Sequence, residues 1–128
     1  MTIRVHKAPV GKLAQVIEDG THTLLTDVQE AEGGDAMAPD PHALLDGALG
    51  ACTALTLKMY AARKGWALDG ADVVITHEES PGQYRLHRTV TLRGGLTDEQ
   101  RSRLLEIANK CPIHRILSGD IVIATELA

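Results

Sequence analysis

The chain has 128 residues, of which 23% are charged, and its formal net charge is −4. This length is typical of one domain, and we expect residues 1–128 to form a single domain with its own hydrophobic core. The acidic balance and the absence of a Lys/Arg stripe argue against nucleic acid as a partner. One Trp, two Tyr and no Phe predict an aliphatic core and leave few side chains on which bases could stack.

The N-terminal residues carry no apolar run of the length found in a secretory leader. We therefore expect a cytoplasmic protein, in which two cysteines are more often reactive or simply buried than joined as a structural staple. A membrane span is not expected either, because Asp46 and Lys58 interrupt the longest apolar stretch.

Three strands are predicted near the N-terminus, over residues 2–8, 12–18 and 21–28. The dipeptide Asp19-Gly20 between the second and third strands is typical of a hairpin turn. Acidic residues, Gly and Pro dominate residues 29–41, which predicts a loop there.

A long helix is predicted from Pro41 to Lys64, with Asp40 as its N-cap and Gly65 just past its end. At 1.5 Å per residue it would span roughly 35 Å and cross the whole domain. Apolar residues occupy nearly every side of it, and a helix of this kind is buried all round. One small sheet cannot cover such a helix, so we infer that a second chain covers the remaining side.

The C-terminal half predicts two strands over residues 71–77 and 84–93, then two helical segments and a last strand. In the second strand apolar and polar residues alternate, and Arg88 falls on the apolar side. Thr97 and Gln100 form a capping box for the first helix, and Pro112 opens the short second one. The last strand is expected over Asp120–Leu127. The predicted order is therefore βββ-α-ββ-αα-β, an α+β protein with a long central helix packed on antiparallel sheets.

Two cysteines, Cys52 and Cys111, are the main candidates for chemistry. A thiolate can attack a peroxide, and a second thiol nearby can trap the resulting sulfenic acid as a disulfide. Cys52 lies on an apolar face of the long helix, whereas Cys111 directly precedes the short helix, where exposed N–H groups favour a thiolate. The alternative is that both are inert buried residues, since free cysteine is among the most buried residue types.

His42 and His114 are candidate titrating groups, and Asp46 follows His42 by four residues and could orient its ring. The short spacing Cys111-x-x-His114 leaves a zinc site open as an alternative, although no Cys-x-x-Cys pair is present. No phosphate-binding loop, dinucleotide fingerprint or Gly-x-Ser-x-Gly motif occurs.

The segments 41–54, 59–66 and 110–115 together resemble the OsmC/Ohr family of thiol-dependent peroxidases. The resemblance covers essentially the whole chain and implies an intertwined homodimer in which sheets from both chains wrap two long helices. It implies that Cys52 attacks the peroxide, that Cys111 resolves the sulfenic acid, and that an external dithiol reduces the disulfide without a metal or other cofactor. The two cysteines are then expected to lie within disulfide range of each other.

One departure from the family pattern concerns the group that activates the thiol. The family uses an N-terminal arginine held by a glutamate at the start of the long helix, but here His42 takes the glutamate position and no arginine occurs between Arg4 and Arg63. Candidates to replace that arginine are His42, His114, Arg115 and Arg88. The leading function is a peroxidase for organic hydroperoxides or hydrogen peroxide. The alternatives are a thiol module that binds a small apolar ligand or senses oxidant, and a structural dimer with inert cysteines.

Overall fold

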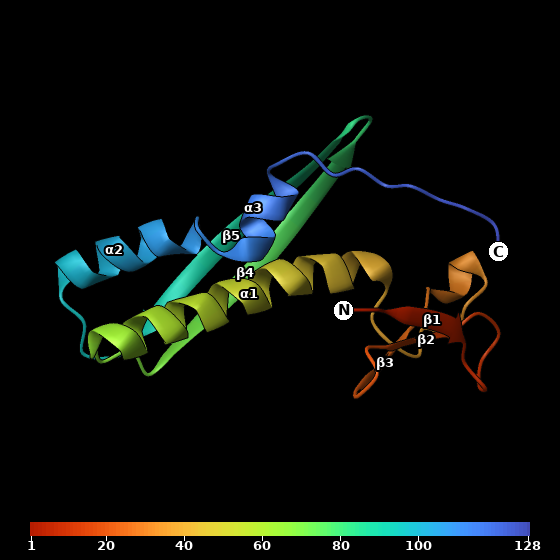
Figure 1. The fold of residues 1–128 in the computed structure, drawn as a ribbon, viewed down its shortest axis with the longest axis horizontal. Helices are drawn as coiled ribbons and strands as arrows, with labels where there is room; N and C mark the ends of the chain where they lie inside the picture. The colour runs from red at the N-terminus through yellow and green to blue at the C-terminus, as the bar shows by residue number, and fades with distance from the viewer. The chain divides into compact units, whose positions relative to one another are not determined.

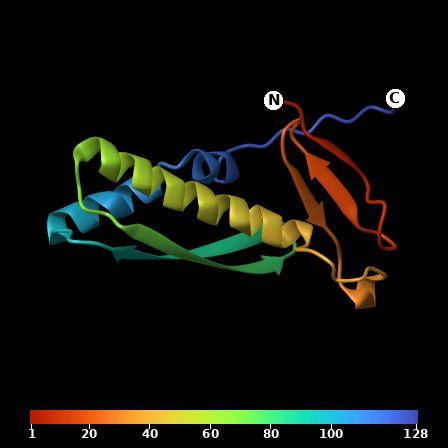
Figure 2. The ribbon, with the colours of Figure 1, turned by 90° about the horizontal axis from the view of Figure 1, so that it is seen from below.

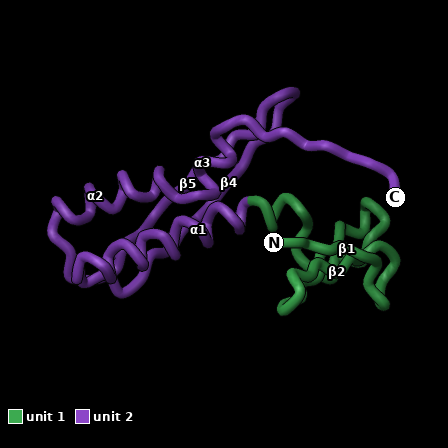
Figure 3. Tube along the Cα trace, in the orientation of Figure 1, with its two compact units in different colours: residues 1–45 green, residues 46–128 purple.

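A computed structural model describes residues 1–128 as an α+β protein with antiparallel sheets and three α-helices (Figure 1), which confirms the predicted fold class. The chain divides into two compact units, residues 1–45 and 46–128 (Figure 3), and each is described by itself. The single domain expected over residues 1–128 stays a prediction.

The first unit contains a three-stranded antiparallel sheet in the order β1-β2-β3. Its strands β1 (Arg4–Lys7), β2 (Gln15–Glu18) and β3 (Thr23–Thr26) are shorter than predicted but follow the predicted sequence. Asp19 closes the β2–β3 turn, because its Oδ1 accepts the backbone N–H groups of Thr21 at 2.9 Å and His22 at 2.7 Å. The hairpin predicted at Asp19-Gly20 is therefore confirmed.

The loop after β3 is organised by Asp27, whose residue exposure is only 3%. Its carboxylate accepts the backbone N–H groups of Val28, Asp35 and Met37 at 2.8, 3.2 and 3.1 Å. These hydrogen bonds, that of Met37 foremost, hold the pKa of Asp27 below its usual value of 3.8. Within the predicted loop the structure adds one short 3₁₀ helix, η1 (Glu30–Glu32).

The long helix α1 (Pro41–Lys64) has the predicted bounds. Asp40 caps it by accepting the Ala43 N–H at 2.8 Å, and Gly65 follows in the left-handed conformation with φ +69°. Its buried residues are Leu49, Thr53, Leu57 and Ala61, spaced by four. One chain therefore fully buries only one line of residues on this helix. No helix in the structure combines the length and hydropathy that a bilayer span requires.

The second unit is built around the hairpin of β4 (Gly70–Ser80) and β5 (Gln83–Arg93). Figure 2 shows α1 running over one face of this hairpin. Residues of β5 alternate between exposed and half-buried, and Arg88 lies on the half-buried side with its apolar neighbours, as predicted. Gly94 ends the strand with φ +141°, and a Cβ there would collide with the Ala67 carbonyl, so only glycine fits.

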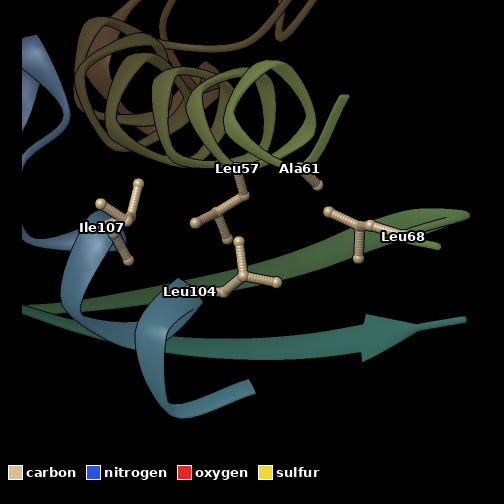
Figure 4. Packing of buried hydrophobic residues seen from close by; sticks show 6 residues of the cluster. Leu57, Ala61, Leu68, Leu104 and Ile107 are labelled. Atoms are coloured by element: carbon tan, nitrogen blue, oxygen red, sulfur yellow. The ribbon is translucent and has the colours of Figure 1, made fainter. Parts of the chain in front are cut away.

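Helices α2 (Asp98–Ala108) and α3 (Pro112–Leu117) complete the second unit. The capping box predicted for α2 is confirmed, because Thr97 and Gln100 each accept the other's backbone N–H at 3.1 Å. The core lies between α1, α2 and the hairpin. In Figure 4, Leu57 and Ala61 point toward Leu104, Ile107 and Leu68; Ala108 completes this buried cluster.

The C-terminal segment differs from the prediction. No strand follows α3, and the expected strand over Asp120–Leu127 is wrong for this chain by itself. A strand is defined by a neighbour that takes its backbone hydrogen bonds, and none of the five strands pairs with this segment. Its apolar side chains are consequently open to solvent, with Val122 92% exposed and Ile123 83% exposed.

Candidate thiol site

Cys111 is a fully buried free thiol at the start of α3. Its Sγ takes the position of the helix N-cap acceptor and accepts the backbone N–H of His114 at 3.3 Å. On the other side, Sγ lies 3.9 Å from the hydroxyl of Thr53. Two hydrogen-bonding groups thus face the sulfur: the His114 N–H as a donor, and the Thr53 hydroxyl, whose oxygen can accept the thiol proton.

Thr53 connects Cys111 to the rest of the site. Its side chain is buried on α1, where its hydroxyl donates a hydrogen bond of 2.7 Å to the Leu49 carbonyl. The same oxygen accepts a hydrogen bond of 2.9 Å from Nη1 of Arg88. Thr53 is therefore shared between a sulfur and a guanidinium group that come from different parts of the chain.

Arg88 is the only cation bound to this cluster, and it comes from the inner side of β5. Its Nη2 donates to Asn109 Oδ1 at 3.0 Å and lies 3.0 Å from Nδ1 of His114. With the Thr53 hydroxyl these are three neutral acceptors, and no carboxylate pairs with the guanidinium. The sequence carried the signal for this residue, since Arg88 breaks the apolar alternation of its strand.

His114 is neutral in this arrangement. Its Nδ1 accepts the Arg88 hydrogen bond, so the ring proton must sit on Nε2. Burial lowers the pKa of His114 below its usual value of 6.5, and the charge of Arg88 lowers it further. Of the histidines named from the sequence, this one therefore joins the cysteine cluster.

We expect the pKa of His114 to make folding stability depend on pH. The folded pKa is lower than the unfolded value near 6.5, so the unfolded chain binds more protons below that pH. The free energy of unfolding should therefore fall as pH drops through 6.5 toward the lower folded pKa. Urea titrations of wild type and His114→Gln across that pH window measure the free energy of unfolding. Its dependence on pH should be weaker in the variant. Identical dependence on pH in both proteins would contradict this assignment.

Cys52 is also a free thiol, half-buried on α1 and directly before Thr53. Its Sγ lies 3.9 Å from the hydroxyl of Thr56, one turn later. Because Thr53 contacts Cys111, the helix brings the two cysteine-bearing segments into contact through adjacent residues. Figure 1 shows α3 beside α1. Formation of a disulfide between Cys52 and Cys111 stays a prediction.

The remaining candidates lie elsewhere. Arg115 is exposed on α3, and His42 is in the first turn of α1, among residues 1–45; an activating role for either stays a prediction. Asp46, proposed from the sequence to orient His42, contacts Nδ1 of His77 and accepts the Tyr84 hydroxyl at 2.8 Å. Sequence spacing carried no signal for these two partners, since they lie on the distant hairpin.

No group of three or more His, Cys, Asp or Glu side chains is placed to hold a metal ion.

A cavity of about 200 Å³ adjoins the cluster, and Arg88 and His114 form part of its wall. The rest of its lining is mainly apolar with two hydroxyl groups: Leu49, Leu86, Leu117, Tyr84 and Ser118. A small molecule with an apolar body and one polar group would fit these surroundings.

The fold and this cluster define a class: an α+β thiol protein whose cysteines lie on a long helix and at the start of a short one. A family model described as OsmC-like protein matches residues 33–126. The chain therefore belongs to the OsmC-like family. No curated protein matches the sequence.

Solved structures share the fold at low sequence identity. An OsmC-like protein from Mycoplasma pneumoniae is 16% identical with TM-score 0.74, and the match covers 93% of this chain and 89% of that one. An organic hydroperoxide resistance protein OsmC from Legionella pneumophila is 18% identical with TM-score 0.64, covering 93% and 90%. The organic hydroperoxide resistance protein OhrB of Bacillus subtilis is 20% identical with TM-score 0.59, covering 94% and 93%.

Proposed function

We propose that this protein is a thiol-dependent peroxidase that reduces organic hydroperoxides or hydrogen peroxide in the cytoplasm. The observation that carries the proposal is the contact between Cys111 and Thr53, which links the second cysteine to the residue beside Cys52. Family membership supports it, as do the names of the Legionella and Bacillus proteins, which refer to resistance to organic hydroperoxides.

The first step uses Cys52 as the nucleophile. Its thiolate attacks one peroxide oxygen, a sulfur–oxygen bond forms, and the oxygen–oxygen bond breaks. The leaving alkoxide or hydroxide takes a proton and departs as alcohol or water, and Cys52 is left as a sulfenic acid. The cavity beside Arg88 would receive the apolar part of the peroxide.

The second step uses Cys111. Its thiolate attacks the Cys52 sulfur, the disulfide bond forms, and hydroxide leaves and is protonated to water. An external dithiol then exchanges with this disulfide, returning two thiols and becoming oxidised itself. No metal or other cofactor takes part. Consumption of an organic hydroperoxide that depends on an added dithiol tests the whole cycle.

A second candidate function is a thiol module that binds a small apolar molecule. The three leucines that line the cavity favour it, because they provide an apolar surface beside a polar end formed by Arg88 and His114. A protein that binds an apolar ligand there, yet consumes no peroxide with any dithiol, would belong to this class instead.

The working form is proposed to be an intertwined homodimer. Five residues of α1 that face away from its buried line are apolar and exposed: Ala48, Ala51, Leu55, Met59 and Ala62. Leu55 is 62% exposed and Met59 is 55% exposed in one chain. A second copy would bury this face, and with it the half-buried Cys52 between Ala51 and Leu55.

We expect wild-type protein to sediment as a dimer at micromolar concentration and Leu55→Asp to lose this state. An aspartate placed in an apolar interface would be desolvated without a partner, which costs several kcal/mol. Analytical ultracentrifugation measures the mass, and Leu55→Met, which keeps an apolar side chain, is the matched control. A folded wild-type monomer at that concentration would contradict the dimer.

A further inference from the structure

We propose that Arg88 and Thr53 form a relay that holds Cys111 as a thiolate, with the Thr53 hydroxyl transmitting the charge of Arg88 to the sulfur. The inference deepens the proposed function, on which it rests, because it assigns the group that prepares the second cysteine for its attack. Arg88 acts here through Thr53 and is a positioning residue.

Thr53 has a single hydroxyl proton, which limits the hydrogen bonds it can donate. Its hydroxyl has one proton, which it donates to the Leu49 carbonyl, while its oxygen accepts the bond from Arg88. In this state only the Cys111 thiol proton can lie between sulfur and oxygen. Once Cys111 loses that proton, the Thr53 hydroxyl can turn and donate to the thiolate. The relay therefore has a distinct hydrogen-bond pattern for each state of the sulfur.

The cluster carries the positive charge of Arg88 with no negative group opposite it. Arg88 is a half-buried cation with three neutral partners, the hydroxyl of Thr53, the amide oxygen of Asn109 and the ring of His114. Burying a charge without an opposite one is costly, so this arrangement is completed by an anion. The Cys111 thiolate would be that anion, since its sulfur shares Thr53 with Arg88.

The backbone N–H of His114 is a second hydrogen-bond donor to the Cys111 sulfur. The N–H of His114 already points at the sulfur at 3.3 Å, and it cannot turn away because it belongs to the first turn of α3. A thiolate would thus receive two hydrogen bonds, one fixed from the backbone and one from Thr53. His114 stays neutral beside Arg88 and adds no second positive charge that would disturb the guanidinium.

The relay would act at the resolving step. The Cys111 thiolate supplies the electron pair for the disulfide bond to the Cys52 sulfur, and hydroxide leaves that sulfur. Only the thiolate is nucleophilic, so a larger thiolate fraction shortens the life of the sulfenic acid. Cys52 then has less time to be oxidised beyond recovery.

The experiment measures ionisation of Cys111 without any peroxide. In Cys52→Ser, Cys111 is the only thiol, and the ultraviolet absorbance of the thiolate is followed against pH. We expect Thr53→Val and Arg88→Met, each added to Cys52→Ser, to move the midpoint upward by about one to two pH units. Thr53→Ser, which keeps the hydroxyl, should leave it in place.

Arg85→Met, on the exposed side of the same strand, is the matched control for Arg88→Met and should not move the midpoint. If neither Thr53→Val nor Arg88→Met moves it, the relay is overturned. If Thr53→Val fails to fold, the difference in titration midpoint between Arg88→Met and Arg85→Met still tests whether Arg88 acts on Cys111. The titration needs no turnover, so a shifted midpoint in a protein that consumes no peroxide would overturn the peroxidase and support the relay.

Discussion

Replacing Cys52 with serine is expected to abolish dithiol-dependent consumption of organic hydroperoxide. A serine hydroxyl does not ionise in the physiological range and cannot take the place of a thiolate as a nucleophile toward peroxide. Cys111→Ser should behave differently: one peroxide oxidises Cys52 to sulfenic acid, no thiol partner resolves it, and a second peroxide then oxidises it to sulfinic acid.

Peroxide consumption and the intact mass of the treated protein separate these two variants. Cys52→Ser should gain no oxygen at residue 52 and show no turnover, whereas Cys111→Ser should gain oxygen atoms on Cys52 and then stop. Arg85→Met, on the exposed side of β5 and in contact with neither thiol, is a suitable control and should consume peroxide at the wild-type rate. Turnover of Cys52→Ser at the wild-type rate would exclude Cys52 as the nucleophile.

Truncating Leu104 to alanine should produce a large loss of stability. Leu104 is fully buried on α2 and packs with Leu57, Ile107 and Leu68, so the change removes apolar contacts and leaves a cavity. Leucine-to-alanine changes at such positions cost about 2–5 kcal/mol in free energy of unfolding.

The next residue on the same helix offers a matched control for this change. Leu105 is 63% exposed, and Leu105→Ala should cost far less. Urea unfolding followed by circular dichroism measures both variants. Equal losses for Leu104→Ala and Leu105→Ala would mean that the core does not lie between α1 and α2 as described.

Local signals in the sequence were strong enough to predict most elements of the fold. Asp40, Pro41 and Gly65 mark the ends of α1, and Thr97 with Gln100 marks the start of α2, because capping depends on a few neighbouring residues. The C-terminal strand could not be predicted correctly in this way. Its apolar residues resemble a strand, but pairing depends on a partner that composition does not reveal.

The candidate site could be predicted only in part. Both cysteines and His114 stand out by residue type, and Arg88 by its place on the apolar side of a strand. The sequence could not show that these residues lie in contact. Packing of the fold brings Thr53, Arg88 and Cys111 together across 35 and 23 residues of sequence. Thr53 had no signal of its own, because a threonine on an apolar helix resembles any other core residue.

The partners of Cys111 come from segments far apart in the chain: α1 provides Thr53, β5 provides Arg88, and α3 provides the backbone N–H. No single segment therefore provides the surroundings of this sulfur. A chain still being synthesised has two ordinary cysteines, which ionise weakly at neutral pH and resist oxidants. The proposed activation of Cys111 would arise only when the last helix docks, so the thiol that resolves the sulfenic acid would become reactive only once folding is complete.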